Sequence, residues 1–190
     1  VAVGRNAMCC NITGTSNTAL GSNALKENNG SQNVAVGTSA LCNNTTGTSN
    51  IAIGVNAACG NTSGYGNISI GLYSNMCSSG NPVNNIYIGN NSSECGNGSN
   101  RTIIGSAAGK YANGNINVAL GYQSLYGQWD AVNSVSLSTG YYNTALGSRS
   151  LFSYKSNIGL VAVGNDAAYS VCTGNYGTAM SGLHHANSLM

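Results

Sequence analysis

The stretch NVAVGTSALCNNTTGTSNIAIGVNAACGNTSGYGNISIG, residues 33–71, contains three near-copies of one short unit. Each copy has an asparagine, three small or branched apolar residues and a glycine. This repeat glycine marks the same unit along the chain at Gly4, Gly21, Gly37, Gly54, Gly71, Gly89, Gly105, Gly121, Gly147 and Gly164, with Ser181 in the same phase. A period this short and regular indicates a stack of identical supersecondary units.

The spacings between repeat positions are 17, 16, 17, 17, 18, 16, 16, 26, 17 and 17 residues. Helical repeats need about 33 residues or more, whereas this unit has turn residues at both ends and a β-branched centre. The sequence therefore predicts an all-β fold, a parallel β-solenoid of about eleven rungs of 16–18 residues, as one repeat domain over residues 1–190. The long interval predicts an insertion loop at about residues 126–142.

Within each unit, two larger apolar or threonine side chains flank a residue that is mostly alanine, as in Val34-Ala35-Val36. Because a strand turns successive side chains to opposite faces, one face is large and the other is small. A rung of about 17 residues encloses a thin interior. We therefore expect the alanines to point inward and the larger face to pack on another chain. The alternative is a lone solenoid with the branched face inward and the alanines lightly exposed.

Two further columns repeat with the same phase. An asparagine four before the repeat glycine is expected to form a rung-to-rung ladder of hydrogen bonds; it occurs at Asn17, Asn33, Asn50, Asn67, Asn85, Asn117 and Asn143. A glycine seven before it predicts a corner with positive φ; it occurs at Gly14, Gly30, Gly47, Gly64, Gly98, Gly114, Gly140 and Gly174. Three residues past the repeat glycine, a small Ala or Ser predicts the turn into a second strand.

The composition excludes several classes of partner. Only six residues are basic and four acidic, so the surface cannot attract nucleic acid or an anionic membrane electrostatically. The chain is 42% hydrophobic with one proline, which argues against disorder. No apolar run reaches membrane-spanning length, so no membrane span is expected.

Two features predict an extracellular location with an oxidising environment: seven cysteines and many Asn-x-Ser/Thr triplets. The candidate N-glycosylation sites are Asn11, Asn29, Asn43, Asn44, Asn61, Asn90, Asn91, Asn97 and Asn100. Asn67 also begins a triplet, but it should stay bare because its amide belongs to the ladder. The alternative is that an Asn-rich, Ser/Thr-rich chain contains most of these triplets by chance.

The positions of four cysteines within the repeat predict disulfides between neighbouring rungs. Cys42 and Cys59 lie five residues after consecutive repeat glycines, and Cys77 and Cys95 lie six after the next two. Neighbouring rungs are about 4.8 Å apart, within disulfide range, so the bonds Cys42–Cys59 and Cys77–Cys95 are expected; four packed thiols are the alternative.

The other cysteines lack internal partners. They are expected to bond between subunits, Cys172 of one to Cys9 or Cys10 of the next. No Cys-x-x-Cys pair has zinc spacing, so neither a metal site nor a cofactor is predicted.

The pattern Asn-x-Ala-hydrophobic-Gly-x-x-Ala/Ser is present as Asn33, Ala35, Val36, Gly37 and Ala40 and recurs along the chain. It resembles the head repeat of YadA-type trimeric autotransporter adhesins and related repeats of phage and algal-virus fibres. The resemblance implies a left-handed parallel β-roll, commonly trimeric, that serves in surface attachment.

Together these features predict a structural subunit of an extracellular glycosylated fibre. Copies would stack head to tail, because an open strand edge templates further pairing, and lateral or trimeric contacts are a further option. The alternative function is a carbohydrate-binding or adhesin head whose ligand loop includes Tyr126, Trp129 and Asp130.

Catalysis is not expected. The acidic residues lie in different rungs and phases, without the carboxylate pair that glycoside hydrolysis uses; they are Glu27, Glu94, Asp130 and Asp166. His184 and His185, in the last rung, have no acidic or cysteine partner nearby in the sequence.

Overall fold

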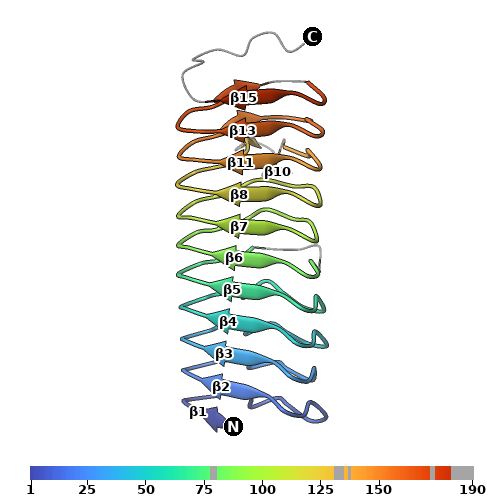
Figure 1. The fold of residues 1–190 in the computed structure, drawn as a ribbon. Helices are drawn as coiled ribbons and strands as arrows, with labels where there is room; N and C mark the ends of the chain where they lie inside the picture. The colour runs from blue at the N-terminus through green and yellow to red at the C-terminus, as the bar shows by residue number, and fades with distance from the viewer. Residues whose placement is uncertain (78–80, 131–134, 137, 172–173, 181–190) are drawn as a thin grey trace.

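The structure is a computed structural model, which describes residues 1–77, 81–130, 135–136, 138–171 and 174–180. This part of the chain contains strands and turns and no helix, stacked into one long solenoid (Figure 1). Eleven parallel strands form the main sheet in the order β1-β2-β3-β4-β5-β6-β7-β8-β11-β13-β15. They belong to about ten turns of about 17 residues, which confirms the predicted parallel β-solenoid.

The strands of the main sheet are short and share one phase. Their bounds are β1 Ala2–Val3, β2 Thr18–Leu20, β3 Val34–Val36, β4 Ile51–Ile53, β5 Ile68–Ile70, β6 Ile86–Ile88, β7 Thr102–Ile104, β8 Val118–Leu120, β11 Thr144–Leu146, β13 Val161–Val163 and β15 Thr178–Met180.

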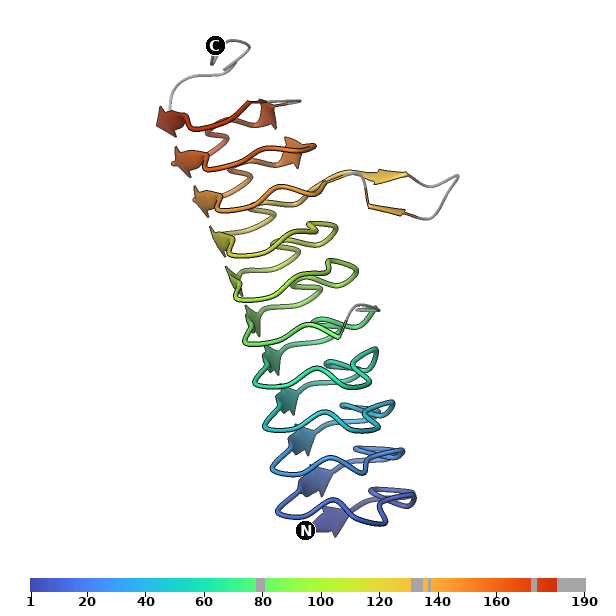
Figure 2. The same ribbon diagram turned by 90° about the vertical axis from the view of Figure 1, so that its right-hand side faces the viewer.

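Two small sheets lie outside this face. β9 (Trp129–Asp130) and β10 (Val135–Ser136) form an antiparallel pair that projects from the solenoid (Figure 2). β12 (Ser153–Tyr154) and β14 (Ser170–Val171) form a parallel pair in the last turns. In the described residues, most turns have no second strand, so the prediction of a second strand in every rung is wrong. Most turns join their neighbours there through a few backbone hydrogen bonds that do not form a strand, such as Leu25 N to Ala40 O at 3.0 Å and Glu27 N to Cys42 O at 3.1 Å.

The register places equivalent residues of successive turns directly over one another. Ala35 pairs with Ala52, and Val34 with Ile51. The central strand residues are fully buried, whereas the flanking residues are half-buried or exposed, as in the pattern of β2 and β8. The alanines therefore point inward as predicted, and the alternative with the branched face inward is wrong. A slip of one residue would exchange the two faces, so burial also determines the register.

The repeat glycines are needed for two reasons. Gly37 has φ +129° and Gly54 has φ +134°, a region that side chains of L-residues rarely adopt. A Cβ on Gly37 would also lie 2.6 Å from the carbonyl oxygen of Gly54 in the next turn. Both conditions recur at each repeat glycine from Gly4 to Gly147.

The second glycine column has a different cause from the predicted one. Among the glycines of this column that follow a described residue, positive φ occurs only at Gly98 (+150°) and Gly114 (+104°), so that prediction is wrong for Gly14, Gly30, Gly47, Gly64 and Gly140. A Cβ on Gly47 would overlap the carbonyl oxygen of Gly64 and the side-chain oxygen of Asn44. The close approach of the next turn and of inward amides excludes a side chain along most of this column.

The asparagine ladder forms as predicted. The Asn50 side-chain oxygen accepts a hydrogen bond from the backbone N–H of Asn67 at 3.0 Å, and its Nδ2 donates to Gly64 O at 2.8 Å. The same two contacts recur at the other ladder asparagines, with Pro82 O or Asn157 O as acceptor in two turns. Each amide therefore satisfies a buried backbone donor and a corner carbonyl.

In one turn, Arg101 occupies the position of the ladder asparagine, four residues before Gly105. Arg101 is 1% exposed, and its guanidinium donates to Ala112 O (2.7 Å), Tyr87 Oη (2.6 Å) and Ser93 Oγ (2.9 Å). Tyr87 takes the place that alanine occupies in most strands. In these turns, two large side chains that hydrogen-bond to each other, Arg101 and Tyr87, replace the smaller residues found at the same positions elsewhere.

Candidate functional site

The outer side of the main sheet is an apolar surface, which we call the apolar face: the first and third residues of each three-residue strand. These positions hold Val, Ile, Leu, Met or Thr and no charged residue. Leu20 is 49% exposed, Leu120 50% and Met180 65%. The ten three-residue strands, at about 4.8 Å spacing, give a surface roughly 50 Å long and on the order of 500 Å² in area. A continuous apolar surface of that size is comparable to the largest apolar patch of a typical monomer, and such patches often have a function.

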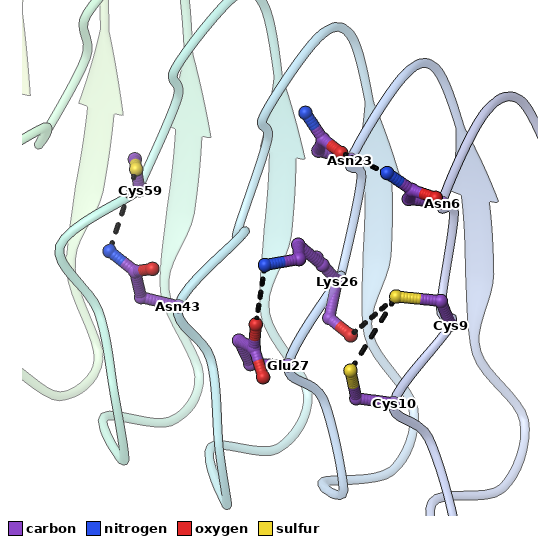
Figure 3. A network of polar contacts seen from close by, with 8 residues as sticks. All are labelled: Asn6, Cys9, Cys10, Asn23, Lys26, Glu27, Asn43 and Cys59. Carbon is purple, nitrogen blue, oxygen red and sulfur yellow. Dashed lines mark hydrogen bonds and ion pairs between the residues drawn. The ribbon is translucent and has the colours of Figure 1, made fainter.

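A second surface follows one corner of the solenoid, which we call the cysteine corner: the fifth and sixth residues after the repeat glycine. Figure 3 shows its first four turns, with the labelled side chains on the same side of successive turns. In the first turn, the Sγ atoms of Cys9 and Cys10 lie 3.5 Å apart. The second turn has the ion pair Lys26–Glu27, with Nζ to Oε1 at 2.8 Å.

Cys42 and Cys59 contact each other across adjacent turns. A hydrogen bond from the Cys42 thiol lowers the pKa of Cys59 to about 7, and the same contact, together with burial, raises the pKa of Cys42. The Asn43 amide also points to the Cys59 sulfur, with Nδ2 to Sγ at 3.7 Å (Figure 3). Both thiols are unbonded here; their neighbouring positions suit the expected disulfide, which stays a prediction.

Cys77 and Cys95 also occupy adjacent turns, together with an acidic residue. The Sγ atoms of Cys77 and Cys95 and a carboxylate oxygen of Glu94 all lie within 4.8 Å of one another. Lys110 Nζ lies 3.0 Å from Glu94 Oε2. Burial, followed by the hydrogen bond with Cys77, raises the pKa of Cys95 to about 12. Sequence reasoning missed Glu94 because it comes close to Cys77 only when the chain completes a turn.

The predicted glycosylation sites fall into two groups. Asn44 is fully buried and Asn61 is 1% exposed. Their amides form a second ladder, in which Asn61 Nδ2 donates to Asn44 Oδ1 at 2.9 Å and Asn44 Nδ2 to Asn28 Oδ1 at 2.6 Å. A glycan on either nitrogen cannot fit this interior, so these two assignments are corrected.

The remaining predicted acceptors are exposed or half-buried: Asn11, Asn29, Asn43, Asn90, Asn91, Asn97 and Asn100. The buried amides share one phase: Asn28, Asn44 and Asn61 each lie seven residues after a repeat glycine, in register across turns. Asn11 has the same phase and its Oδ1 accepts a hydrogen bond from Asn28 Nδ2 at 3.1 Å, but Asn11 is only half-buried.

The insertion region contains two arrangements. Tyr126 stacks on Phe152 with centroids 4.8 Å apart, and Phe152 stacks on Tyr169 at 4.9 Å. Tyr126 is thus part of an aromatic ladder along the solenoid. Trp129 and Asp130 form β9 of the projecting hairpin. Cys172, His184 and His185 lie outside the described residues.

Two of the other acidic residues, Glu27 and Asp166, each form an ion pair with a basic residue. Glu27 pairs with Lys26, and Asp166 Oδ2 lies 2.7 Å from Arg149. Over the described ranges, no helix is long and apolar enough to cross a membrane. No family model, curated protein or solved structure matches the chain.

Proposed function

We propose that the chain is a structural subunit of an extracellular glycosylated fibre. The observation that carries this proposal is the apolar face, which extends along every turn and contains no charge. A rod with one continuous apolar side is suited to pack against a second copy of itself. The apolar face offers about 500 Å² per chain, which is below the roughly 800 Å² per partner of a standard interface. We therefore expect other residues along the rod to add to the contact between two copies.

End-to-end stacking is the second part of the proposal. Successive turns pair in the same register throughout the main sheet. Within the described residues, β1 pairs with β2 on one side only. A further turn, from another copy or from a continuing chain, could therefore form the same parallel backbone hydrogen bonds with the other side of β1. Between two copies, such a contact is heterologous and produces an open filament.

Sedimentation of the purified chain tests the lateral contact. The variant Ile53→Lys/Ile70→Lys places two charges on the apolar face and should convert associated protein to monomer. Ile53→Thr/Ile70→Thr keeps β-branching, as Thr102 and Thr144 do naturally, and should weaken association without unfolding the sheet.

Ile12→Lys is the matched control, because Ile12 is 86% exposed and lies outside the strands. The control should associate as the original chain does. Equal association of all four proteins would contradict a role for the apolar face.

The projecting hairpin supports a second candidate, carbohydrate binding or adhesion. β9 and β10 are the described strands that leave the stack (Figure 2), and loops that leave a solenoid often carry binding sites. A glycan array distinguishes the two functions. Binding that disappears when the hairpin is deleted favours adhesion, whereas unchanged assembly of the deletion variant favours the structural role.

A further inference from the structure

We propose that Cys77, Glu94 and Cys95 form a binding site for a thiophilic divalent cation, with Zn²⁺ as the probe ion. Cys77 comes from one turn, and Glu94 and Cys95 come from the next. Their three ligand atoms already lie within 4.8 Å of one another. This site is independent of the proposed fibre function.

The required adjustment is small. A tetrahedral Zn²⁺ with two thiolates and one carboxylate holds its donor atoms roughly 3.5–3.8 Å apart, from bond lengths of about 2.3 Å and 2.0–2.2 Å. The donors here, at most 4.8 Å apart, must therefore approach by at most about 1.3 Å. The Cys77 side chain is exposed, so rotation about its Cα–Cβ bond can supply this movement. A fourth position is left for water.

Neighbouring polar groups orient the carboxylate. Asn91 Nδ2 donates to Glu94 Oε2 at 2.6 Å, and Lys110 Nζ approaches the same oxygen at 3.0 Å. Both contacts are on Oε2, which leaves the lone pairs of Oε1 for a cation. Partners of this kind hold a ligand in position and raise metal affinity.

The charges also balance. Two thiolates and one carboxylate around a divalent cation have a net charge of −1, and the Lys110 ammonium next to Glu94 neutralises it. Binding displaces one proton from each thiol to solvent and transfers no electrons. The site therefore belongs to the dithiol form, and the Cys77–Cys95 disulfide expected under oxidising conditions uses the same two sulfurs.

The same chain offers a matched comparison. Cys42 and Cys59 also stack across adjacent turns, but the polar neighbour of Cys59 is the Asn43 amide (3.7 Å), which donates and is a poor ligand. Among the described residues, Cys77, Glu94 and Cys95 form the one group whose three possible ligand atoms lie within 4.8 Å of one another. Two thiols without a carboxylate should bind Zn²⁺ more weakly.

Residue-resolved alkylation of the reduced full chain tests the site. Iodoacetamide is added with and without one equivalent of Zn²⁺, and each cysteine peptide is quantified by mass spectrometry. We expect Zn²⁺ to slow alkylation of Cys77 and Cys95 at least about tenfold and that of Cys42 and Cys59 less than about twofold. Glu94→Gln should remove most of the protection, since loss of a ligand costs more than the roughly 10–100-fold of a supporting group.

Co²⁺ supplies an independent readout through sulfur-to-metal charge-transfer absorption. The band should be lost in Cys77→Ser and retained in Cys42→Ser. Absence of protection, equal protection of both pairs, or protection unchanged in Glu94→Gln would overturn the proposal.

Discussion

Cys59 should react near neutral pH. The Cys42 thiol lowers its pKa to about 7, so about half of Cys59 is thiolate at pH 7, whereas an ordinary cysteine ionises near 8.5. Because the thiolate is the nucleophile, the alkylation rate of reduced protein should rise through pH 7 and level off above pH 8. In Cys42→Ala the midpoint should move up by more than one pH unit. Rates at the Cys59 peptide measure this, and an unmoved midpoint would contradict the assigned hydrogen bond.

A single methyl group on a repeat glycine should be strongly destabilising. In Gly54→Ala, the side chain would adopt φ +134° and lie 2.5 Å from the carbonyl oxygen of Gly71. A side chain held in this sparsely populated positive-φ region costs about 1–3 kcal/mol, and the clash adds to it. We expect a loss of at least about 2 kcal/mol in urea denaturation.

Gly174→Ala is the control for this substitution. Among the described residues, the nearest atoms to a Cβ on Gly174 would lie at 3.8 and 3.9 Å, ordinary contact distances. Its unfolding free energy should change by less than about 1 kcal/mol. Equal effects at both positions would show that backbone close approach is not what requires glycine at Gly54.

Glycan occupancy should follow burial. Asn43 is exposed, whereas its neighbour Asn44 is fully buried, although both begin acceptor triplets. When the chain is expressed through a secretory pathway, glycopeptide mass spectrometry should find glycan at Asn43 and none at Asn44, Asn61 or Asn67. Full occupancy of Asn67, which is 2% exposed, would be incompatible with the ladder.

The asparagine ladder should contribute more stability than an exposed asparagine does. Asn50→Ala removes the acceptor for the Asn67 backbone N–H and the donor to Gly64 O. Each buried group left unpaired costs about 1–3 kcal/mol. We expect Asn50→Ala to lower the unfolding free energy by about 2–4 kcal/mol.

Asn43→Ala is the matched control, because Asn43 is exposed and outside the ladder. Its unfolding free energy should stay within about 0.5 kcal/mol of the original. The two variants are compared by urea denaturation of reduced protein, and equal stability would contradict the ladder's role.

At the level of turns, sequence reasoning identified some columns correctly and missed others. The strand triplets and the ladder of Asn50 and Asn67 follow from spacing alone, because their phase recurs in almost every unit. The triplet motif wrongly predicts the inward Asn44 and Asn61 as glycan acceptors, because the motif carries no information about which way a corner side chain points. Glycine spacing alone predicts positive φ for the column of Gly47. It cannot reveal the crowding by the next turn, which is a contact between residues 17 apart.

At the scale of the whole assembly, the predicted covalent fibre has a direct test. Cys9 and Cys10 are exposed, which suits a bond to Cys172 of another copy. Assembled material should migrate as a ladder of multimers in non-reducing electrophoresis, and Cys172→Ser should collapse that ladder to monomer. Release of 190-residue monomer without reductant would refute the bond, whatever the state of the apolar face.

The sequence alone determined the solenoid, its period, the inward alanines and the ladder of Asn50, because a repeating unit must bury the same positions in every turn. Only the tertiary structure decided which amides and thiols become neighbours. Glu94 reaches Cys77, and Asn61 reaches Asn44, across one full turn of the chain. The physical reason is that the direction of a corner side chain depends on the backbone angles of several consecutive corner residues, and the spacing of residue types does not specify those angles.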